Sequence, residues 1–357
     1  MKILVLGGTG AMGVPVVQIL AERRNEVYVT TRRNKTSSIK NVKFIRGDAH
    51  NLDFVKDLVR EEFDTVIDFM VYPSSDFPKY CELYLKNTKQ YMFLSSSRVY
   101  ANSKGKKLTE NSPRLLDVTI DEEYLKTDEY ALAKAREEDF LRSSGYSNFT
   151  VIRPYITYYN NRLQLGIYEK ETWLQRALDG KKIVFSNNIA SKLTTLTYGY
   201  DVSLRIADLV GNEKALGQIY HITTEESIKW QDVLNCYLDT LEEYLGKRPE
   251  VCMIDQCDPL FEKLSHYQVH CDREYDRVFS NHKIQKDTGE KKIFVKVRDG
   301  LKKSLREFLE GKRRFTYRSW RAEAVFDRIT GERSSLLKIP TLKNKLKYFL
   351  FRYIVKH

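Results

Sequence analysis

The sequence predicts an α/β protein with a doubly wound parallel sheet, and three observations support this prediction. Apolar segments of five or six residues recur along the first half of the chain, at residues 2–6, 26–31, 42–46, 65–69, 90–95 and 149–153. Segments with helical periodicity alternate with them, and a glycine-rich turn directly follows the first segment. Strands and helices that alternate at these lengths are typical of parallel sheets with helices on both faces.

The glycine-rich turn precedes a helix expected over residues 11–23. Glycines at this position allow a tight turn, a close approach of the backbone to a pyrophosphate, and close packing of the helix on the strand. The helix N-terminus also offers free amide groups and the positive end of its dipole to phosphates. We therefore predict a dinucleotide-binding site here rather than a purely structural turn. The expected contact residues are Gly7, Thr9, Gly10, Ala11, Met12 and Gly13.

The end of the second predicted strand bears on which dinucleotide binds. An acidic residue that binds the ribose is expected there when the cofactor is NAD. Thr30, Thr31, Arg32 and Arg33 occupy this place instead, and an arginine can pair with the 2′-phosphate of NADP. The sequence leaves NAD and NADP both open. It favours NADP through Arg32 and Arg33, unless these residues form only a solvated turn.

Tyr130, Lys134 and Ser96 are the predicted catalytic residues. Tyr130 and Lys134 are four residues apart in a helix expected to end near residue 142, so their side chains share one face. An isolated phenol ionises only near about pH 10, and a neighbouring ammonium stabilises the phenolate. Ser96 follows the fifth predicted strand and can hold the reacting C–O group in line. Such a spacing is common on ordinary helix surfaces, but its place after the fifth strand favours catalysis.

The chain is expected to form a dinucleotide-binding domain and a smaller lobe. The first covers residues 1–165, with returning segments around residues 190–225. Residues 166–310, with helices and short strands such as those near 182–185 and 250–254, form the substrate-binding lobe. Apolar residues recur at helical spacing over 230–245 and indicate either core packing or a dimer face.

The positive charge of the chain is concentrated in its last part. Residues 290–357 contain 20 lysine and arginine residues against 7 acidic ones, while the preceding 289 residues are nearly neutral. Residues 311–357 are expected to form a basic helical tail. Its part over 336–357 can contact an anionic membrane, dock on its own domain or on another subunit, or bind nucleic acid. Nucleic acid is disfavoured because no recognition module is visible. The tail has an apolar stripe made of Ile339, Leu342, Leu346, Phe349, Leu350, Tyr353 and Ile354.

The remaining composition favours a cytoplasmic protein, either free or at the inner face of the membrane. No apolar run approaches the roughly 20 residues of a membrane span, and five scattered cysteines argue for a reducing compartment. Cys252, Cys257, His266 and His270 have a spacing that loosely resembles a zinc finger, but the central gap is too short. We expect ordinary packing and no metal at these residues.

Five motifs occur in an order that resembles the extended short-chain dehydrogenase/reductase superfamily, in its branch of NAD(P)-dependent nucleotide-sugar epimerases and dehydratases. The resemblance covers roughly residues 1–310 and implies a Rossmann domain with a substrate-binding cap. The motifs are GGTGAMG at Gly7, GDA at Gly47, SSSRVY at Ser95, YALAK at Tyr130 and IRPYITYYNNR at Ile152.

The resemblance also implies roles for individual residues. Tyr130 would remove a sugar hydroxyl proton while hydride passes to the nicotinamide, with Lys134 binding the nicotinamide ribose and Ser96 completing the set. Asp48 would contact adenine, and the other implied cofactor contacts are Ala49, Phe69 and Pro154. The implied substrate contacts are Ser96, Ser97, Arg98, Tyr155, Asn160 and Arg162.

Departures from the family pattern narrow the expected activity. Dehydratases carry an Asp-Glu pair where Ser97 and Arg98 stand, so dehydration is not expected. We expect a homodimeric enzyme that acts on a sugar, with a nucleotide sugar favoured as the substrate. An epimerase is favoured over a ketoreductase. The alternative is a non-catalytic dinucleotide-binding or RNA-binding protein on the same fold, as among the plant-chloroplast relatives of this branch.

Overall fold

The computed structural model describes the chain except residues 258–264, 290–292, 312–314 and 356–357. The chain divides into two compact units, each made of three stretches. Unit 1 contains Met1–Tyr159, Thr195–Glu226 and Val278–Val295. Unit 2 contains Asn160–Thr194, Ser227–Arg277 and Lys296–His357.

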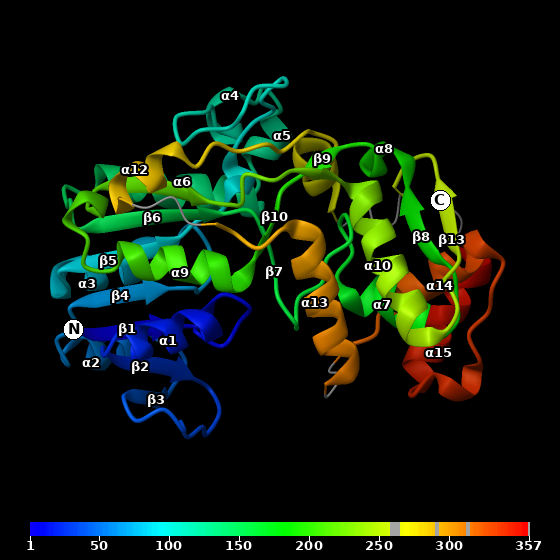
Figure 1. The fold of residues 1–357 in the computed structure, drawn as a ribbon, viewed down its shortest axis with the longest axis horizontal. Helices are drawn as coiled ribbons and strands as arrows, with labels where there is room; N and C mark the ends of the chain where they lie inside the picture. The colour runs from blue at the N-terminus through cyan, green and yellow to red at the C-terminus, as the bar shows by residue number, and fades with distance from the viewer. Residues whose placement is uncertain (258–264, 290–292, 312–314, 356–357) are drawn as a thin grey trace. The chain divides into compact units, whose positions relative to one another are not determined.

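Unit 1 is built on a seven-stranded sheet in the order β11-β6-β5-β4-β1-β2-β3, in which every pair of neighbours is parallel (Figure 1). The doubly wound parallel sheet expected from the sequence is thereby confirmed. Its strands are β1 (Lys2–Leu6), β2 (Glu26–Thr31), β3 (Val42–Arg46), β4 (Thr65–Asp68), β5 (Gln90–Leu94), β6 (Phe149–Pro154) and β11 (Gln218–Ile222).

Each face of this sheet has its own apolar core. Side chains alternate along β1, so Ile3 and Val5 pack in one core with α1, α9 and α12, while Leu4 and Leu6 pack in the other with α2, α3 and α6. Helices on both faces leave the central strands buried, which explains their continuous apolar runs. The flanking helices are α1 (Gly13–Glu22), α2 (Leu52–Val59), α3 (Phe77–Asn87), α6 (Tyr130–Ser143), α9 (Gly199–Leu209) and α12 (His282–Thr288).

Two elements of unit 1 bear on the expectations from the sequence. The strand near 218–222 lies within the returning segments expected around residues 190–225, and it pairs with β6 to complete the central sheet. The helix that contains Tyr130 was expected to begin near residue 121 or 128, and α6 begins at Tyr130 itself. The shorter elements are η1 (Ser97–Val99), α4 (Leu115–Val118), α5 (Glu122–Leu125), β7 (Ile156–Tyr158), β10 (Leu196–Tyr198) and η2 (Glu213–Ala215).

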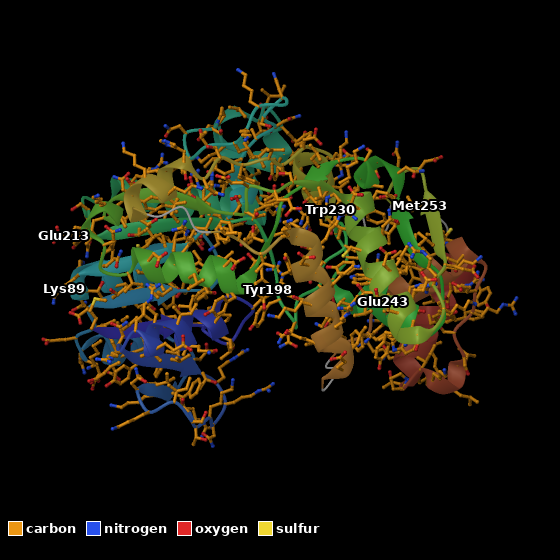
Figure 2. The ribbon with its side chains drawn as sticks, viewed as in Figure 1. Lys89, Tyr198, Glu213, Trp230, Glu243 and Met253 are labelled. Carbon is orange, nitrogen blue, oxygen red and sulfur yellow. The ribbon has the colours of Figure 1, made fainter. Side chains whose placement is uncertain are left out.

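Unit 2 packs around α10, which begins at Trp230 (Figure 2). Trp230 and Tyr237 are buried, and the ring of Tyr237 stacks on that of Trp173 at 4.5 Å between centroids. The apolar face of this helix is therefore core packing rather than a dimer face. The elements are α7 (Lys170–Leu178), β8 (Ile183–Ser186), α8 (Asn187–Ala190), β9 (Leu193–Thr194), β12 (Ile228–Lys229), α10 (Trp230–Leu245), β13 (Val251–Ile254), η3 (Val269–Arg273), α13 (Val297–Glu310), α14 (Trp320–Thr330), η4 (Leu336–Lys338), α15 (Leu342–Phe349) and η5 (Leu350–Ile354).

Within unit 2, the end of the basic tail packs on α14. Ile339 and Tyr348 are buried against Trp320 and Ala324, with Phe351 at the edge of the cluster. A buried ionic network adjoins this cluster. In it the Arg176 guanidinium lies within 3 Å of carboxylate oxygens from three acidic residues, and one of these, Asp327, accepts a hydrogen bond from Tyr348.

The structure also bears on membranes and metals. Among the described residues, none of the helices combines the length and apolarity needed to cross a bilayer. In the same residues, no three His, Cys, Asp or Glu side chains are grouped so that they could hold a metal ion. In the window that loosely resembles a zinc finger, His270 faces Glu274 at 2.8 Å, and none of the five cysteines, all of which lie in the described residues, forms a disulfide.

Candidate active site

The predicted site residues of unit 1 gather at one edge of the sheet. Because neighbouring strands are parallel, the residues that end or follow β1, β4, β5 and β6 lie at the same edge. These residues are the glycine turn after Leu6, Asp68 and Phe69, Ser95 and Ser96, and Pro154. In open α/β sheets, this edge is where ligands bind.

The glycine turn has the geometry of a phosphate-binding loop. Gly7 has φ +66°, which only glycine adopts without strain, and its amide donates to Thr30 Oγ1 at 3.3 Å. A Cβ on Gly13 would lie 2.5 Å from the carbonyl carbon of Gly8, whereas a Cβ on Gly10 would meet nothing within 4 Å. Met12 caps α1 without a side-chain hydrogen bond, so no cap side chain of its own competes with a ligand for the first amides. The turn therefore fits a dinucleotide pyrophosphate.

A basic cavity of about 280 Å³ lies beside the carboxyl ends of β2 and β3. Its charged lining residues are Arg33, Lys35 and Arg46, and no acidic residue lines it. Arg32 lies outside this lining but close enough to Asp48 to help lower the pKa of that carboxyl, after the larger effect of the His50 amide. The two arginines at the end of the second strand thus lie in different places. Arg33 lines the cavity, and Arg32 lies near Asp48.

Tyr130 stands at the first position of α6 with its side chain accessible. The residue is 37% exposed, and its hydroxyl makes no hydrogen bond with the residues that the structure describes. Glu129 caps the helix by accepting from the Ala131 amide, and its carboxylate pairs with Arg98 at 2.6 Å. The Arg98 guanidinium lies 5.5 Å from the centre of the Tyr130 ring. The phenol is therefore open to a ligand and has a cation beside its ring.

Lys134 is buried one helical turn after Tyr130. It is 1% exposed, with its ammonium 2.9 Å from Glu137 and 4.5 Å from the centre of the Phe93 ring. This ammonium has no well-oriented hydrogen-bond acceptor in the described structure. Apart from the ion pair with Glu137, the N–H groups of this buried ammonium lack acceptors, which costs stability unless a ligand supplies them. The position fits the ribose hydroxyls of a bound nicotinamide nucleotide.

Two buried carboxyl groups, those of Glu137 and Asp68, interact with the charge of Lys134. Burial raises the pKa of Glu137 to about 7, against the opposing effect of Lys134. Burial also raises the pKa of Asp68 to about 6, although the Met70 amide and the Tyr91 hydroxyl donate to it. Neither acid was among the predicted site residues. Glu137 follows Lys134 by three positions, a helical spacing that indicates contact, whereas nothing local pairs Asp68 with α6.

The raised pKa values predict a pH dependence of stability. A carboxyl whose folded pKa lies above its unfolded value stabilises the fold fully at low pH, and this contribution is lost as pH rises through the folded value. We expect Asp68→Asn to reduce the fall in unfolding free energy between about pH 4 and 7. A pKa raised from 3.8 to about 6 corresponds to about 3 kcal/mol.

Denaturant unfolding of the chain and of the Asp68→Asn variant over this pH range measures the effect. The exposed Asp57, changed to asparagine, serves as the matched control. Equal pH dependence in the chain and the Asp68→Asn variant would exclude a titrating buried carboxyl at position 68.

Ser96 and Ser97 have different environments at the end of β5. Ser96 is 7% exposed, and its oxygen accepts from the Arg98 amide at 3.2 Å, which leaves its hydroxyl hydrogen available to a substrate. Ser97 is fully buried and donates to the Arg153 carbonyl at 2.8 Å, so its hydroxyl hydrogen is already used. Arg153 in turn pairs with Glu138 of α6, Nε to Oε1 at 2.8 Å, which ties β6 and Pro154 to that helix.

The other predicted substrate contacts are divided between the units. Tyr155 is buried in unit 1, where its ring lies 5.3 Å from that of Phe279. Asn160 and Arg162 belong to unit 2, and Arg162 lies 3.8 Å from Glu169. The structure therefore brings Ser96, Tyr130 and Lys134 into unit 1 with the glycine turn.

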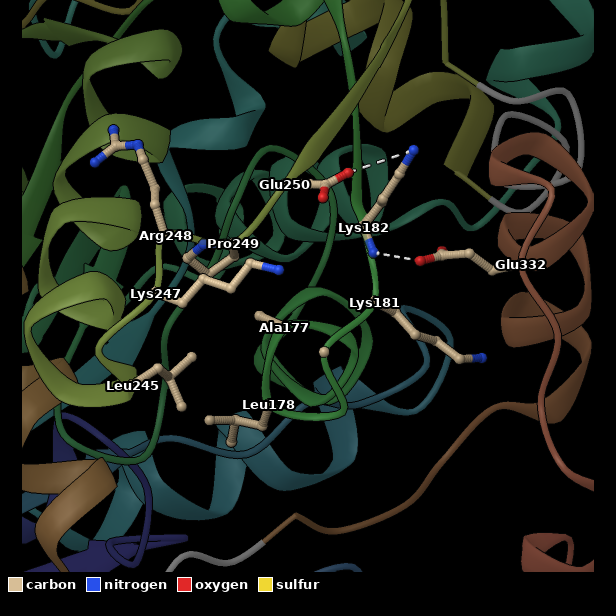
Figure 3. A pocket seen from close by; sticks show the side chains of 11 residues that line it. Ala177, Leu178, Lys181, Lys182, Leu245, Lys247, Arg248, Pro249, Glu250 and Glu332 are labelled. Atoms are coloured by element: carbon tan, nitrogen blue, oxygen red, sulfur yellow. Dashed lines mark hydrogen bonds and ion pairs between the residues drawn. The ribbon is translucent and has the colours of Figure 1, made fainter.

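A separate cavity of about 290 Å³ lies within unit 2 and is lined by none of the predicted site residues (Figure 3). Three of its four cationic side chains have acidic partners. Lys182 lies 3.4 Å from Glu250, Lys181 lies 2.8 Å from Asp327 and Arg248 lies 2.7 Å from Asp239. These ion pairs do not favour the binding of an anion in this cavity.

Comparisons with known proteins show which families and folds the chain is similar to. Residues 3–78 match the model of the NAD dependent epimerase/dehydratase family. The chain is 25% identical over 242 residues to the chloroplast stem-loop binding protein of 41 kDa b from Arabidopsis thaliana, and 24% identical over 241 residues to 2′-dehydrokanamycin reductase from Streptomyces kanamyceticus. These alignments cover 64% and 65% of this chain but only 60% and 64% of the relatives, less than two thirds of each.

Solved structures support the fold. The UDP-glucose 4-epimerase of Thermus thermophilus, determined with NAD, aligns with a TM-score of 0.62 and 20% identity over 87% of this chain and 99% of the epimerase. At this identity the likeness establishes the fold alone. Residues 3–78 are thus similar to the NAD dependent epimerase/dehydratase family, and the chain shares the fold of the Thermus epimerase.

Proposed function

We propose that the chain is an NAD(P)-dependent epimerase or ketoreductase that acts on a sugar, with nucleotide sugars as the substrate class. The observation that carries this proposal is that α6 presents an accessible Tyr130 four residues before Lys134, whose buried ammonium is paired with Glu137 and has N–H donors left for a ligand. Both belong to the same unit as the glycine turn and Ser96, whose hydroxyl is free to donate.

The proposed mechanism assigns one task to each residue. Tyr130 takes the proton from a sugar hydroxyl and returns it when the carbonyl is reduced. Ser96 donates a hydrogen bond to the reacting oxygen, and Lys134 holds the ribose while its charge favours the phenolate. A nicotinamide ring, when bound, supplies the hydride acceptor and donor.

Within this class we favour an epimerase over a reductase. Epimerases and reductases need the same three residues and differ in whether the keto intermediate is retained. Dehydration is disfavoured because Ser97 and Arg98 stand where dehydratases have an Asp-Glu pair. Arg98 is also already paired with Glu129. The relative from Streptomyces is named a reductase, which keeps the ketoreductase as the second candidate.

The test is a panel of nucleotide sugars incubated with the protein and either NAD or NADPH. An epimerase interconverts two sugars with no net change in nicotinamide absorbance, whereas a reductase consumes NADPH in proportion to product. Nicotinamide binding with conversion of any panel sugar supports the proposal. Absence of both binding and conversion would overturn it.

We also propose that the cofactor is NADP rather than NAD. Arg33 and Arg46 line the basic cavity at the ribose end, where a 2′-phosphate would pair with them. Arg33→Ala is expected to raise the Kd for NADP by about tenfold or more while the Kd for NAD changes little. The exposed Arg60, changed to alanine, is the matched control. An equal loss of NAD and NADP affinity would contradict the assignment.

A non-catalytic RNA-binding role is the alternative, favoured by the name of the Arabidopsis relative. Binding of an RNA hairpin measured by anisotropy at about 0.15 M salt separates the two, because nonspecific phosphate contacts weaken steeply with salt. Tight hairpin binding together with an inactive sugar panel would favour this alternative.

A further inference from the structure

The last helices of unit 2 carry an apolar surface that faces outward. We define the tail face as six side chains of α15 and η5, in which Leu342 is 73% exposed and the other five are between 41% and 58% exposed. Single exposed leucines are ordinary on protein surfaces, but six neighbouring apolar side chains on one helical face are not. The tail face consists of Leu342, Leu346, Phe349, Leu350, Tyr353 and Ile354.

This face is exposed because the opposite side of the tail makes the attachment. Tyr348 packs on Trp320 and donates to Asp327 at 2.7 Å. Arg328 of α14 donates to the Phe351 carbonyl at 3.2 Å. An amphipathic helix normally packs its apolar stripe on its own domain. Here the predicted stripe, except Ile339, remains outside the contact.

The charged side chains of the last part of the tail are all positive. From Arg333 to the end of the given sequence there are seven lysines and arginines and no acidic residue. Lys343, Lys345 and Lys347 occupy every second position of this part of α15 and make no ion pair with the residues that the structure describes. Their charges are therefore available to an acidic partner.

The positive charge and the apolar side chains of the tail face together indicate which kind of partner it binds. A second copy of the tail would bring like charges together, which opposes association. A nucleic acid would use the lysines but would leave six apolar side chains without a partner. The surface of an anionic bilayer satisfies both, because acyl chains accept the apolar side chains and headgroup phosphates accept the lysines.

We propose that the tail face binds peripherally to the surface of an anionic lipid bilayer. Leu346, Phe349 and Tyr353 enter the boundary between headgroups and acyl chains, and the lysines of α15 reach the phosphates. This inference is independent of the proposed catalytic activity, because Tyr130 and Lys134 lie in unit 1 and the tail lies in unit 2.

Vesicle co-sedimentation of the full chain tests the proposal. We expect pelleting with vesicles that contain about 30% phosphatidylserine, little pelleting with pure phosphatidylcholine, and release at about 0.5 M salt. Lys343→Gln/Lys345→Gln/Lys347→Gln is expected to weaken binding roughly a hundredfold. Failure of the full chain to pellet with anionic vesicles would overturn the proposal.

The apolar contribution is tested by Leu346→Ser/Phe349→Ser. A matched control comes from unit 1, where Val118 and Ile120 are exposed to 51% and 95% and are changed to serine. The tail variant is expected to lose vesicle binding, the control to keep it, and both to retain the melting curve of the parent. Equal vesicle binding by both variants would overturn the proposal. It would also be overturned if the tail variant still bound vesicles but had lost dimerisation or the binding of an RNA hairpin.

Discussion

Tyr130→Phe is expected to lower kcat by about a thousandfold, the size typical of losing a positioned acid–base group. The hydroxyl makes no hydrogen bond with the described residues, so its removal breaks no contact of the fold. The ring beside Arg98 is retained, and Lys134 keeps its place. Cofactor affinity is therefore expected to change less than threefold, a range estimated as less than about 0.7 kcal/mol.

Turnover on the active panel sugar and cofactor titration by fluorescence measure the two expectations for Tyr130→Phe separately. Tyr146→Phe is the matched control, because Tyr146 lies in unit 1 outside the site. Undiminished turnover in Tyr130→Phe would remove Tyr130 from the mechanism. A parallel loss of cofactor affinity would instead show that the hydroxyl binds rather than transfers a proton.

Gly13→Ala is expected to abolish cofactor binding and to destabilise unit 1. The new Cβ would lie 2.5 Å from the carbonyl carbon and 2.6 Å from the Cα of Gly8, and both are backbone atoms. The turn and the start of α1 must separate, which costs about 1–3 kcal/mol as overpacking does elsewhere. Thermal melting and cofactor titration measure the two effects.

Gly10→Ala is the paired control for Gly13→Ala. A Cβ at Gly10 meets no atom within 4 Å, so melting is expected to stay unchanged. Cofactor affinity is expected to fall, because the methyl group occupies space that the backbone leaves open to phosphate. Normal cofactor binding in Gly13→Ala would rule out the turn as the dinucleotide site.

The parts of the fold that the sequence predicted are those fixed by local pattern. The buried strand at residues 2–6, the glycine turn and α1 follow from neighbouring residues alone. Tyr130 and Lys134 follow from a spacing of four on a helix. The pairing of the strand at 218–222 with β6 could not be predicted from local pattern, because its partner lies 68 residues earlier in the chain.

Other contacts could not be predicted because they depend on which side of a helix is buried. The periodicity of the tail identified its apolar stripe but left open whether this stripe packs on its own domain or faces outward. The contact with α14 is made by Tyr348, whose hydroxyl donates to Asp327 in a buried ionic network. Likewise, Asp68 and Lys134 meet through tertiary packing of β4 and α6, which no local spacing encodes.

The discontinuity of unit 1 has a consequence for how the chain folds. Residues 278–295 belong to the same unit as the first strand, and β11 fills the edge of the sheet beside β6. A ribosome must therefore release about four fifths of the chain before all three stretches of unit 1 are available to fold together. Fragments that end near residue 160 would expose the edge of β6, and exposed strand edges promote aggregation. Expression of the whole chain, rather than of an isolated nucleotide-binding fragment, is thus the productive route to a folded protein.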